Sequence, residues 1–174
     1  IFGQNEDDLI NNARFAQVMY NSRYQGFTPP TRPTVYTETD TGSVRIYWDD
    51  AAETAIDVLT GYSDFEGYKI YKSTDGGSTW GSAPDRIYDT DGLFVGWRPY
   101  QQFDLSAEED SLHCVYSNEY TCERSLRRNH SISGPDPYFP WFNLGEDTGL
   151  EMVRLNESEW KVMDGVTYKY MFVD

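Results

Sequence analysis

The sequence predicts a mostly β domain, an antiparallel β-sandwich with a helix at its N-terminal end and a long inserted loop region. Several short segments alternate in residue type with the period of two of a strand, and residues 43–48 are the clearest. Gly-, Asp- and Pro-rich turns separate these segments. Aromatic residues make up 16% of the chain, including fourteen Tyr and five Trp. They concentrate in the strand-like segments, which favours β structure.

The overall composition limits the functions open to this chain. Its 174 residues are enough to bury a core without disulfides. A net charge of −15, from 29 acidic against 14 basic residues, repels phosphate backbones, so we expect no nucleic-acid partner. The mean hydropathy is −0.67 and no long apolar run occurs, so we expect no membrane span.

The first 29 residues are predicted to form a helix and a linker. Asn5 is a suitable helix cap, and apolar residues recur at helical spacing from Leu9 onward, so we expect a helix over about residues 7–20. We expect its apolar face to pack on the main domain. The linker is Pro-rich, because residues 26–33 read Gly-Phe-Thr-Pro-Pro-Thr-Arg-Pro and must run extended.

The main domain is predicted to cover residues 30–174 and to begin with two strands, over residues 34–39 and 43–49, joined by a turn. Trp48 should lie near the centre of the core. A third strand over residues 65–72 leads into a turn at Asp75-Gly-Gly77, and we expect the next strand to follow as the second arm of a hairpin.

The loop between the second and third strands is rich in carboxylates. Asp49, Asp50, Asp57 and Asp64 are the candidate ligands of a calcium ion, a hard cation that takes several oxygens. Solvated loop charges explain the same residues equally well, and no calcium-loop spacing decides between the two interpretations. Calcium is the one cofactor that the sequence suggests.

An inserted region is predicted over about residues 101–150, because the strand periodicity fails there. It contains the two cysteines, Cys114 and Cys122, for which we expect a disulfide that closes a short loop in an oxidising compartment; two unpaired thiols are the alternative. Strand character returns over residues 152–155 and 166–173, with Asp164-Gly165 as a turn.

The order of these segments resembles the fibronectin type III-like modules, of immunoglobulin-like fold, found in large secreted or cell-surface bacterial proteins. The resemblance rests on Val44 to Trp48, on Gly67 to Lys72, and on Gly165 to Tyr170. It implies a sandwich whose last strand is missing from this sequence. A partner chain, a neighbouring domain or the N-terminal segment would then complete the sheet by strand addition.

A second resemblance is to the Asp-box of sialidase-like β-propellers. Residues 73–80 read Ser-Thr-Asp-Gly-Gly-Ser-Thr-Trp and match the pattern at every defined position, namely Ser73, Asp75, Gly77, Thr79 and Trp80. The box occurs once, whereas propellers repeat it in each blade. We therefore interpret it as a structural clamp, in which Asp75 accepts bonds from turn amides while Trp80 packs beneath.

The sequence favours a non-catalytic extracellular module that serves in structure, assembly or adhesion. His113 and His130 are the only histidines, and no nucleophile elbow or phosphate loop is present, so we expect no enzyme. The alternative is a carbohydrate-binding accessory module of a secreted glycoside-active enzyme. Its sugar-stacking residues would be aromatics: Trp97, Tyr100, Tyr138, Trp141 and Phe142. Packing within the inserted region explains the same residues and is the favoured interpretation, because so long an insertion needs a core of its own.

Overall fold

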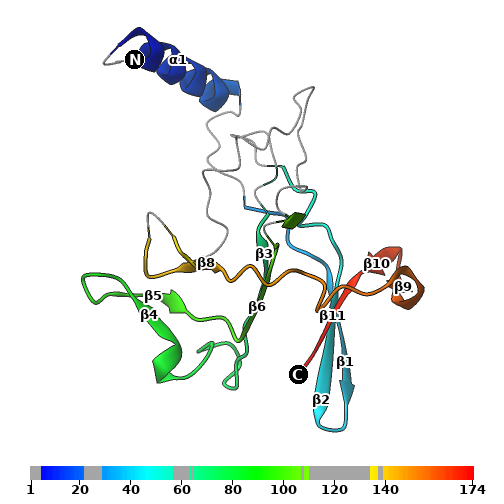
Figure 1. The fold of residues 1–174 in the computed structure, drawn as a ribbon. Coiled ribbons are helices and arrows are strands. Elements are labelled where there is room, and N and C mark those ends of the chain that lie inside the picture. The colour runs from blue at the N-terminus through cyan, green and yellow to red at the C-terminus, as the bar shows by residue number, and fades with distance from the viewer. Residues whose placement is uncertain are drawn as a thin grey trace. The chain divides into compact units, whose positions relative to one another are not determined.

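The computed structural model describes residues 5–21, 29–56, 63, 65–106, 108–109, 134–136 and 139–174 (Figure 1). These fall into two compact units. The first holds residues 5–21, 29–32, 51–56, 63 and 65, and the second holds the rest. Small antiparallel sheets dominate the described part of the chain, so the prediction of a mostly β protein is confirmed.

The first unit contains the helix α1 (Glu6–Asn21), on the segment for which the sequence predicts a helix. Its described apolar side chains do not form a covered face, since Leu9 is 45% and Tyr20 65% exposed. The expected packing of this helix on the main domain stays a prediction. Elsewhere in the unit Phe65 is buried, and the Ser63 hydroxyl donates to the Glu53 carbonyl over 3.0 Å. No described helix has the length and apolar character of a membrane span.

A three-stranded antiparallel sheet organises the second unit. Its strands are β1 (Val35–Asp40), β2 (Ser43–Trp48) and β11 (Tyr170–Val173), with β2 in the middle. The turn between β1 and β2 uses Gly42 at a φ of 80°, a conformation that glycine adopts without a steric penalty. Trp48 pairs with Val35 on one side and with Tyr170 on the other, so the predicted core residue sits in the central strand.

The remaining strands form two-stranded ladders. These are β3 (Gly67–Ile70) with β6 (Gln101–Asp104), β4 (Arg86–Tyr88) with β5 (Phe94–Trp97), β7 (Gly134–Pro135) with β8 (Asn143–Gly145), and β9 (Lys161–Met163) with β10 (Val166–Tyr168). Two short 3-10 helices, η1 (Ala83–Asp85) and η2 (Glu157–Glu159), precede β4 and β9. Asp164 and Gly165 join β9 to β10 with φ angles of 51° and 81°, as the predicted Asp-Gly turn requires.

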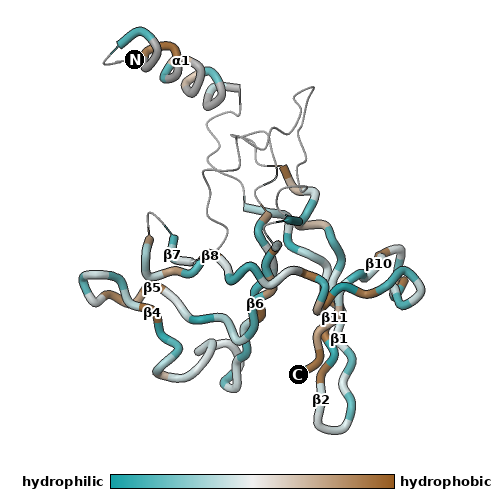
Figure 2. The backbone as a smooth tube through the Cα atoms, viewed as in Figure 1, coloured by the Kyte–Doolittle hydropathy of each residue, from teal (hydrophilic) through white to brown (hydrophobic). Residues whose placement is uncertain are grey.

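Aromatic rings join the three-stranded sheet to the β3–β6 ladder. The indole of Trp48 stacks on the ring of Tyr170 at 5.6 Å between centroids, and Tyr68 of β3 meets both rings edge-on or tilted at 5.4 and 5.3 Å. All three residues are buried. A second contact joins Phe172 of β11 to Phe103 of β6 at 5.8 Å. Figure 2 shows hydrophobic residues along β2 and β11, where this core lies.

The strand partners differ from the sequence prediction in two places. The segment after Trp80 does not pair back on β3, because β3 pairs with β6 and β4 pairs with β5. The predicted Asp-box hairpin is therefore wrong, and the box is a turn between two separate ladders. The region assigned to an insertion begins with β6, whose Phe103 and Asp104 are buried.

Two C-terminal predictions also need correction. Residues 152–155 form a turn with a single bridge from Arg154 to Tyr170, not a strand. The strand expected over 166–173 divides at Lys169, because β10 pairs with β9 and β11 with β2. The Lys169 amide donates to the Trp48 carbonyl while its carbonyl accepts from Leu155, so the chain passes from one sheet to another at this residue.

Candidate functional site

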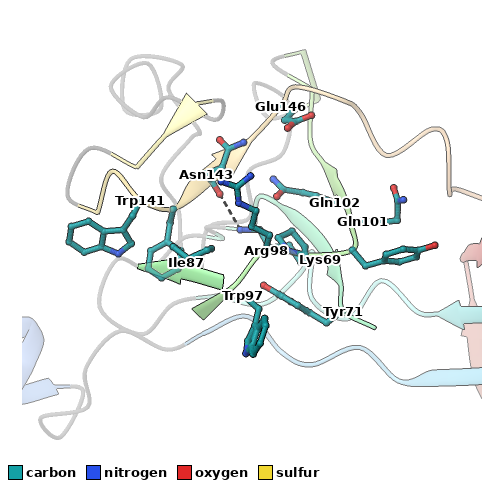
Figure 3. A pocket seen from close by; sticks show the side chains of 13 residues that line it. Lys69, Tyr71, Ile87, Trp97, Arg98, Gln101, Gln102, Trp141, Asn143 and Glu146 are labelled. Atoms are coloured by element: carbon teal, nitrogen blue, oxygen red, sulfur yellow. Dashed lines mark hydrogen bonds between the residues drawn. The ribbon is translucent and has the colours of Figure 1, made fainter. Parts of the chain in front are cut away.

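The second unit carries a recess of about 500 Å³, which we call the aromatic recess (Figure 3). Its walls come from β3, the β4–β5 hairpin, the segment leading into β6, and the segment around β8. The lining residues are Lys69, Tyr71, Ile87, Trp97, Arg98, Pro99, Tyr100, Gln101, Gln102, Trp141, Phe142, Asn143 and Glu146. Four of the five aromatics that the sequence selected for sugar stacking, all but Tyr138, line this recess. Tyr138 lies outside the described residues.

Three aromatic rings of the recess, those of Trp97, Trp141 and Tyr100, each pack against another aromatic ring. Trp97 meets Phe94 in a T-shaped contact at 5.4 Å between centroids. Trp141 lies 5.8 Å from Phe139. The remaining ring, that of Tyr100, packs edge-on against the core at 6.5 Å from Phe172 and is 47% exposed. Rings held in this way keep a fixed orientation and still present surface to a ligand.

The Tyr100 hydroxyl is also fixed. It donates to an Asp174 carboxylate oxygen over 2.7 Å, and the Lys72 ammonium bonds the other oxygen of Asp174 over 2.6 Å. The hydrogen bond to Asp174 raises the pKa of Tyr100, because the phenol donates its proton to an anion. The Lys72 ammonium also lies 5.1 Å from the centre of the Tyr100 ring, a cation–π distance.

Polar groups lie among the rings of the aromatic recess. The Lys69 ammonium donates to the Asn143 carbonyl over 3.2 Å (Figure 3). Desolvation lowers the pKa of Lys69, and the nearby Asp104 partly opposes this effect. Two basic side chains and one carboxylate, that of Glu146, line the recess. This is a local basic excess on a chain whose net charge is −15.

The β3–β6 ladder sets the spacing of these polar groups. Its register places Lys69 opposite Gln102 and Ile70 opposite Gln101. The Gln102 amide then donates to the Leu144 carbonyl over 3.0 Å, which ties the ladder to the segment around β8. The recess is therefore assembled from segments far apart in the sequence.

Asp104, the last residue of β6, fixes residues 146–148, the segment that includes the recess residue Glu146. Only 2% of this residue is exposed. One carboxylate oxygen accepts from the amides of Glu146 and Asp147 at 2.9 and 2.6 Å, and the other accepts from the Thr148 hydroxyl at 2.8 Å. Sequence reasoning missed Asp104, since a single Asp in a segment without clear periodicity gives no local signal.

The Asp-box forms a compact turn beside the recess. The Asp75 carboxylate accepts from the Thr79 amide at 2.9 Å, from the Thr79 hydroxyl at 2.7 Å and from the Ser73 hydroxyl at 2.8 Å. The Ser73 hydroxyl oxygen in turn accepts from the Gly77 amide at 2.8 Å. Trp80, which the sequence predicts to pack against the turn, lies with its ring beside Gly77 and meets Tyr71 edge-on at 6.5 Å, while 42% of the residue stays exposed.

Two of the four candidate calcium ligands, Asp49 and Asp50, lie within the described residues, and each has a protein partner. Asp50 forms an ion pair with Lys169 at 2.6 Å, and a carboxylate oxygen of Asp49 accepts from the Thr34 amide at 3.1 Å. Asp57 and Asp64, the other two candidate ligands, lie outside the described residues. No group of three or more His, Cys, Asp or Glu suited to a metal ion occurs within the described ranges.

The predicted disulfide between Cys114 and Cys122 also falls outside the described residues and stays a prediction.

Comparison with protein-family models, with curated proteins and with solved structures returns no match for this chain.

Proposed function

We propose that this chain is a non-catalytic carbohydrate-binding module of a secreted or cell-surface protein. The observation that carries the proposal is that Trp97, Tyr100 and Trp141 all line one recess, which polar side chains also line. A recess of about 500 Å³ with aromatic walls and a few polar groups has the size and character of a small-molecule site.

The chemistry of the lining favours a sugar over a purely apolar ligand. A pyranose ring has apolar C–H faces that pack on aromatic rings, while its hydroxyl groups lie around the edge. The side chains of Gln101, Asn143 and Glu146 offer amide donors, amide acceptors and a carboxylate to such hydroxyls. Arg98 adds further donors, and its guanidinium forms no ion pair with a described residue.

We further propose that the second unit is an immunoglobulin-like or fibronectin type III-like sandwich. The contact of Tyr68 in the β3–β6 ladder with Trp48 and Tyr170 in the three-stranded sheet supports it, because two sheets packed through aromatic side chains are the basis of a sandwich. The β4–β5 hairpin and β8, which wall the recess, are then additions to this framework.

Glycan-array screening followed by calorimetry tests the binding function. We expect wild-type protein to bind at least one oligosaccharide, and Tyr100→Ala to weaken that binding about tenfold or more, as expected for an anchoring aromatic. Tyr100→Phe should keep most of the affinity, because it keeps the ring and loses only the bond to Asp174. Tyr20→Ala is the matched control, since Tyr20 is 65% exposed on α1 and does not line the recess.

Two results of these measurements would count against the proposed glycan site. Failure of the wild-type protein to bind any member of an array that spans neutral and acidic glycans would contradict the proposal. Equal affinity of wild type and Tyr100→Ala would place the glycan elsewhere on the protein.

An assembly or adhesion role is the second candidate function, and the edge strand β1 favours it. β1 pairs with β2 along one edge, and no described strand pairs with its other edge. An open edge is a template for strand addition by another chain or domain. Mass measurement by light scattering over a range of concentrations checks this role, and a monomer at all concentrations would count against self-assembly.

A further inference from the structure

The proposed glycan site in the aromatic recess assigns no role to the Asp-box. Its hydrogen bonds fix the backbone from Ser73 to Thr79, the residues that precede Trp80. The indole also folds back over the turn, because a Cβ placed on Gly77 would lie 3.7 Å from its ring. The box therefore holds a large apolar ring in one orientation at the surface.

Trp80 is poorly placed for a purely structural role. Its side chain remains 42% exposed, and among the described residues its one ring contact is the edge-on meeting with Tyr71. The indole N–H makes no hydrogen bond to any described residue. A clamp that served only to close the turn would gain more by burying this ring.

Two further hollows connect Trp80 with the aromatic recess. One, of about 380 Å³, is lined by Trp80 and also by Arg98, Pro99 and Tyr100, three residues that line the aromatic recess as well. The second, of about 500 Å³, is lined by Tyr71, Trp80 and Trp97, of which Tyr71 and Trp97 belong to the aromatic recess as well. Trp80 thus lines two hollows that share residues with the aromatic recess.

We propose that Trp80 is a second stacking platform and that the ligand is an extended oligosaccharide, which lies across the aromatic recess and continues onto the Asp-box. This inference rests on the proposed glycan-binding function. The Asp-box then acts as a positioning device, because a ring held rigidly before binding loses little conformational entropy when the ligand arrives.

The polar groups of the connecting hollow suit the same ligand. Thr74, Ser82 and Arg98 line it beside the two rings and supply partners for sugar hydroxyls. The carboxylate of Asp85 is positioned by the amide and hydroxyl of Ser82, at 2.7 and 2.6 Å. These bonds also lower the pKa of Asp85, so the group stays ionised and acts as an acceptor. Aromatic rings together with hydrogen-bonding groups fit a polar chain better than a lipid or an apolar peptide.

Chain-length dependence of binding tests the inference on the whole protein. From the oligosaccharide series that the wild-type protein binds on the array, short and long members are titrated by calorimetry. We expect long members to bind about tenfold more tightly than short ones, as expected when a second aromatic anchor is engaged. Trp80→Ala should reduce the affinity for long members to that for short ones, with binding of the short members unchanged.

Two further measurements keep the test independent of folding defects. The indole N–H resonance of Trp80 in the wild-type protein should shift when a long member is added and stay in place with a short one. Asp75→Ala, which loosens the turn and leaves the ring present, should lose part of the preference for long members. Trp160→Phe is the control variant, because Trp160 lies outside all three hollows.

The outcomes separate this inference from the function on which it rests. Equal binding of long members by wild type and by folded Trp80→Ala overturns the second platform while the recess remains the glycan site. Equal affinity of wild type for short and long members overturns it as well. Absence of all glycan binding by the wild-type protein contradicts the proposed function itself, and this inference with it.

Discussion

Asp75 shows how a single exposed carboxylate can organise a turn. The Thr79 amide is the largest cause that lowers the pKa of Asp75 to about 2, followed by the hydroxyls of Thr79 and Ser73. Each donates a hydrogen bond to the charged form of the carboxylate, and hydrogen bonds to the charged form lower the pKa of an acid. The turn and the ionised state of Asp75 therefore stabilise each other.

This coupling predicts a dependence of stability on pH. The folded pKa of Asp75 is depressed, so its contribution is present above the unfolded value, near 4, and is lost as the pH falls from about 4 to about 2. Asp75→Asn should lower the melting temperature by about 2–4 °C near neutral pH. The difference from wild type should shrink toward zero over that acidic range, in thermal melts followed by circular dichroism.

Asp91→Asn is the control for this prediction, since it removes the same charge from an exposed turn in which the Asp91 side chain makes no hydrogen bond with a described residue. A difference between Asp75→Asn and wild type that stayed constant from neutral to acidic pH would show that ionised Asp75 does not hold the turn.

At the scale of elements, the β3–β6 ladder connects the core with the candidate site. Tyr68 faces the core, whereas its neighbour Lys69 lines the aromatic recess, which follows from the alternation of side chains along a strand. At Gly67, the first residue of β3, the backbones of β3 and β6 lie unusually close to each other. A Cβ on Gly67 would lie 2.3 Å from the Phe103 carbonyl oxygen and 2.5 Å from the Cα of Asp104.

Gly67 is therefore required by space as well as by its φ of 153°. Gly67→Ala should lower the free energy of unfolding by about 2–4 kcal/mol, because it adds backbone overlap to backbone strain. Gly42→Ala, at a turn glycine with φ 80° and open space around it, should cost only about 1 kcal/mol. Urea denaturation measures both values, and equal costs would show that the approach of β3 to β6 is not tight.

At the scale of the whole molecule, the excess of acidic residues is the main electrostatic feature. A net charge of −15 favours solubility and also destabilises the compact state through repulsion among like charges. The ion pairs of the described part, such as Lys161 with Glu38 and Lys169 with Asp50, offset this repulsion only locally.

Added salt should therefore stabilise the protein. Because the screening length falls from about 30 Å at 0.01 M to about 8 Å at 0.15 M salt, repulsion between distant carboxylates weakens. We expect the melting temperature to rise by a few degrees over this range in scanning calorimetry. Matched measurements in NaCl and KCl control for specific ion effects, and a fall in the melting temperature in both would contradict the argument.

The sequence by itself determined the features that depend on neighbouring residues. Alternating residue types placed β1 and β2 almost residue for residue, because successive side chains of a strand point to opposite faces. The Asp-Gly pair located the turn between β9 and β10, since both residues there need positive φ. Residue type also marked Trp97, Tyr100 and Trp141 as candidates for sugar stacking, although the sequence could not show whether their rings are exposed.

Only the tertiary structure decided which segments meet. β6 lacks a clear period of two and was assigned to an insertion, yet it pairs with β3 and supplies the buried Phe103 and Asp104. The continuous pattern over 166–173 did not reveal the change of sheet at Lys169, because pairing partners lie far away in the sequence. The exposure of Trp80 likewise depends on segments that lie far away in the sequence. Local bonds define the Asp-box turn, but what covers its tryptophan depends on distant segments, and they leave the ring open beside the recess.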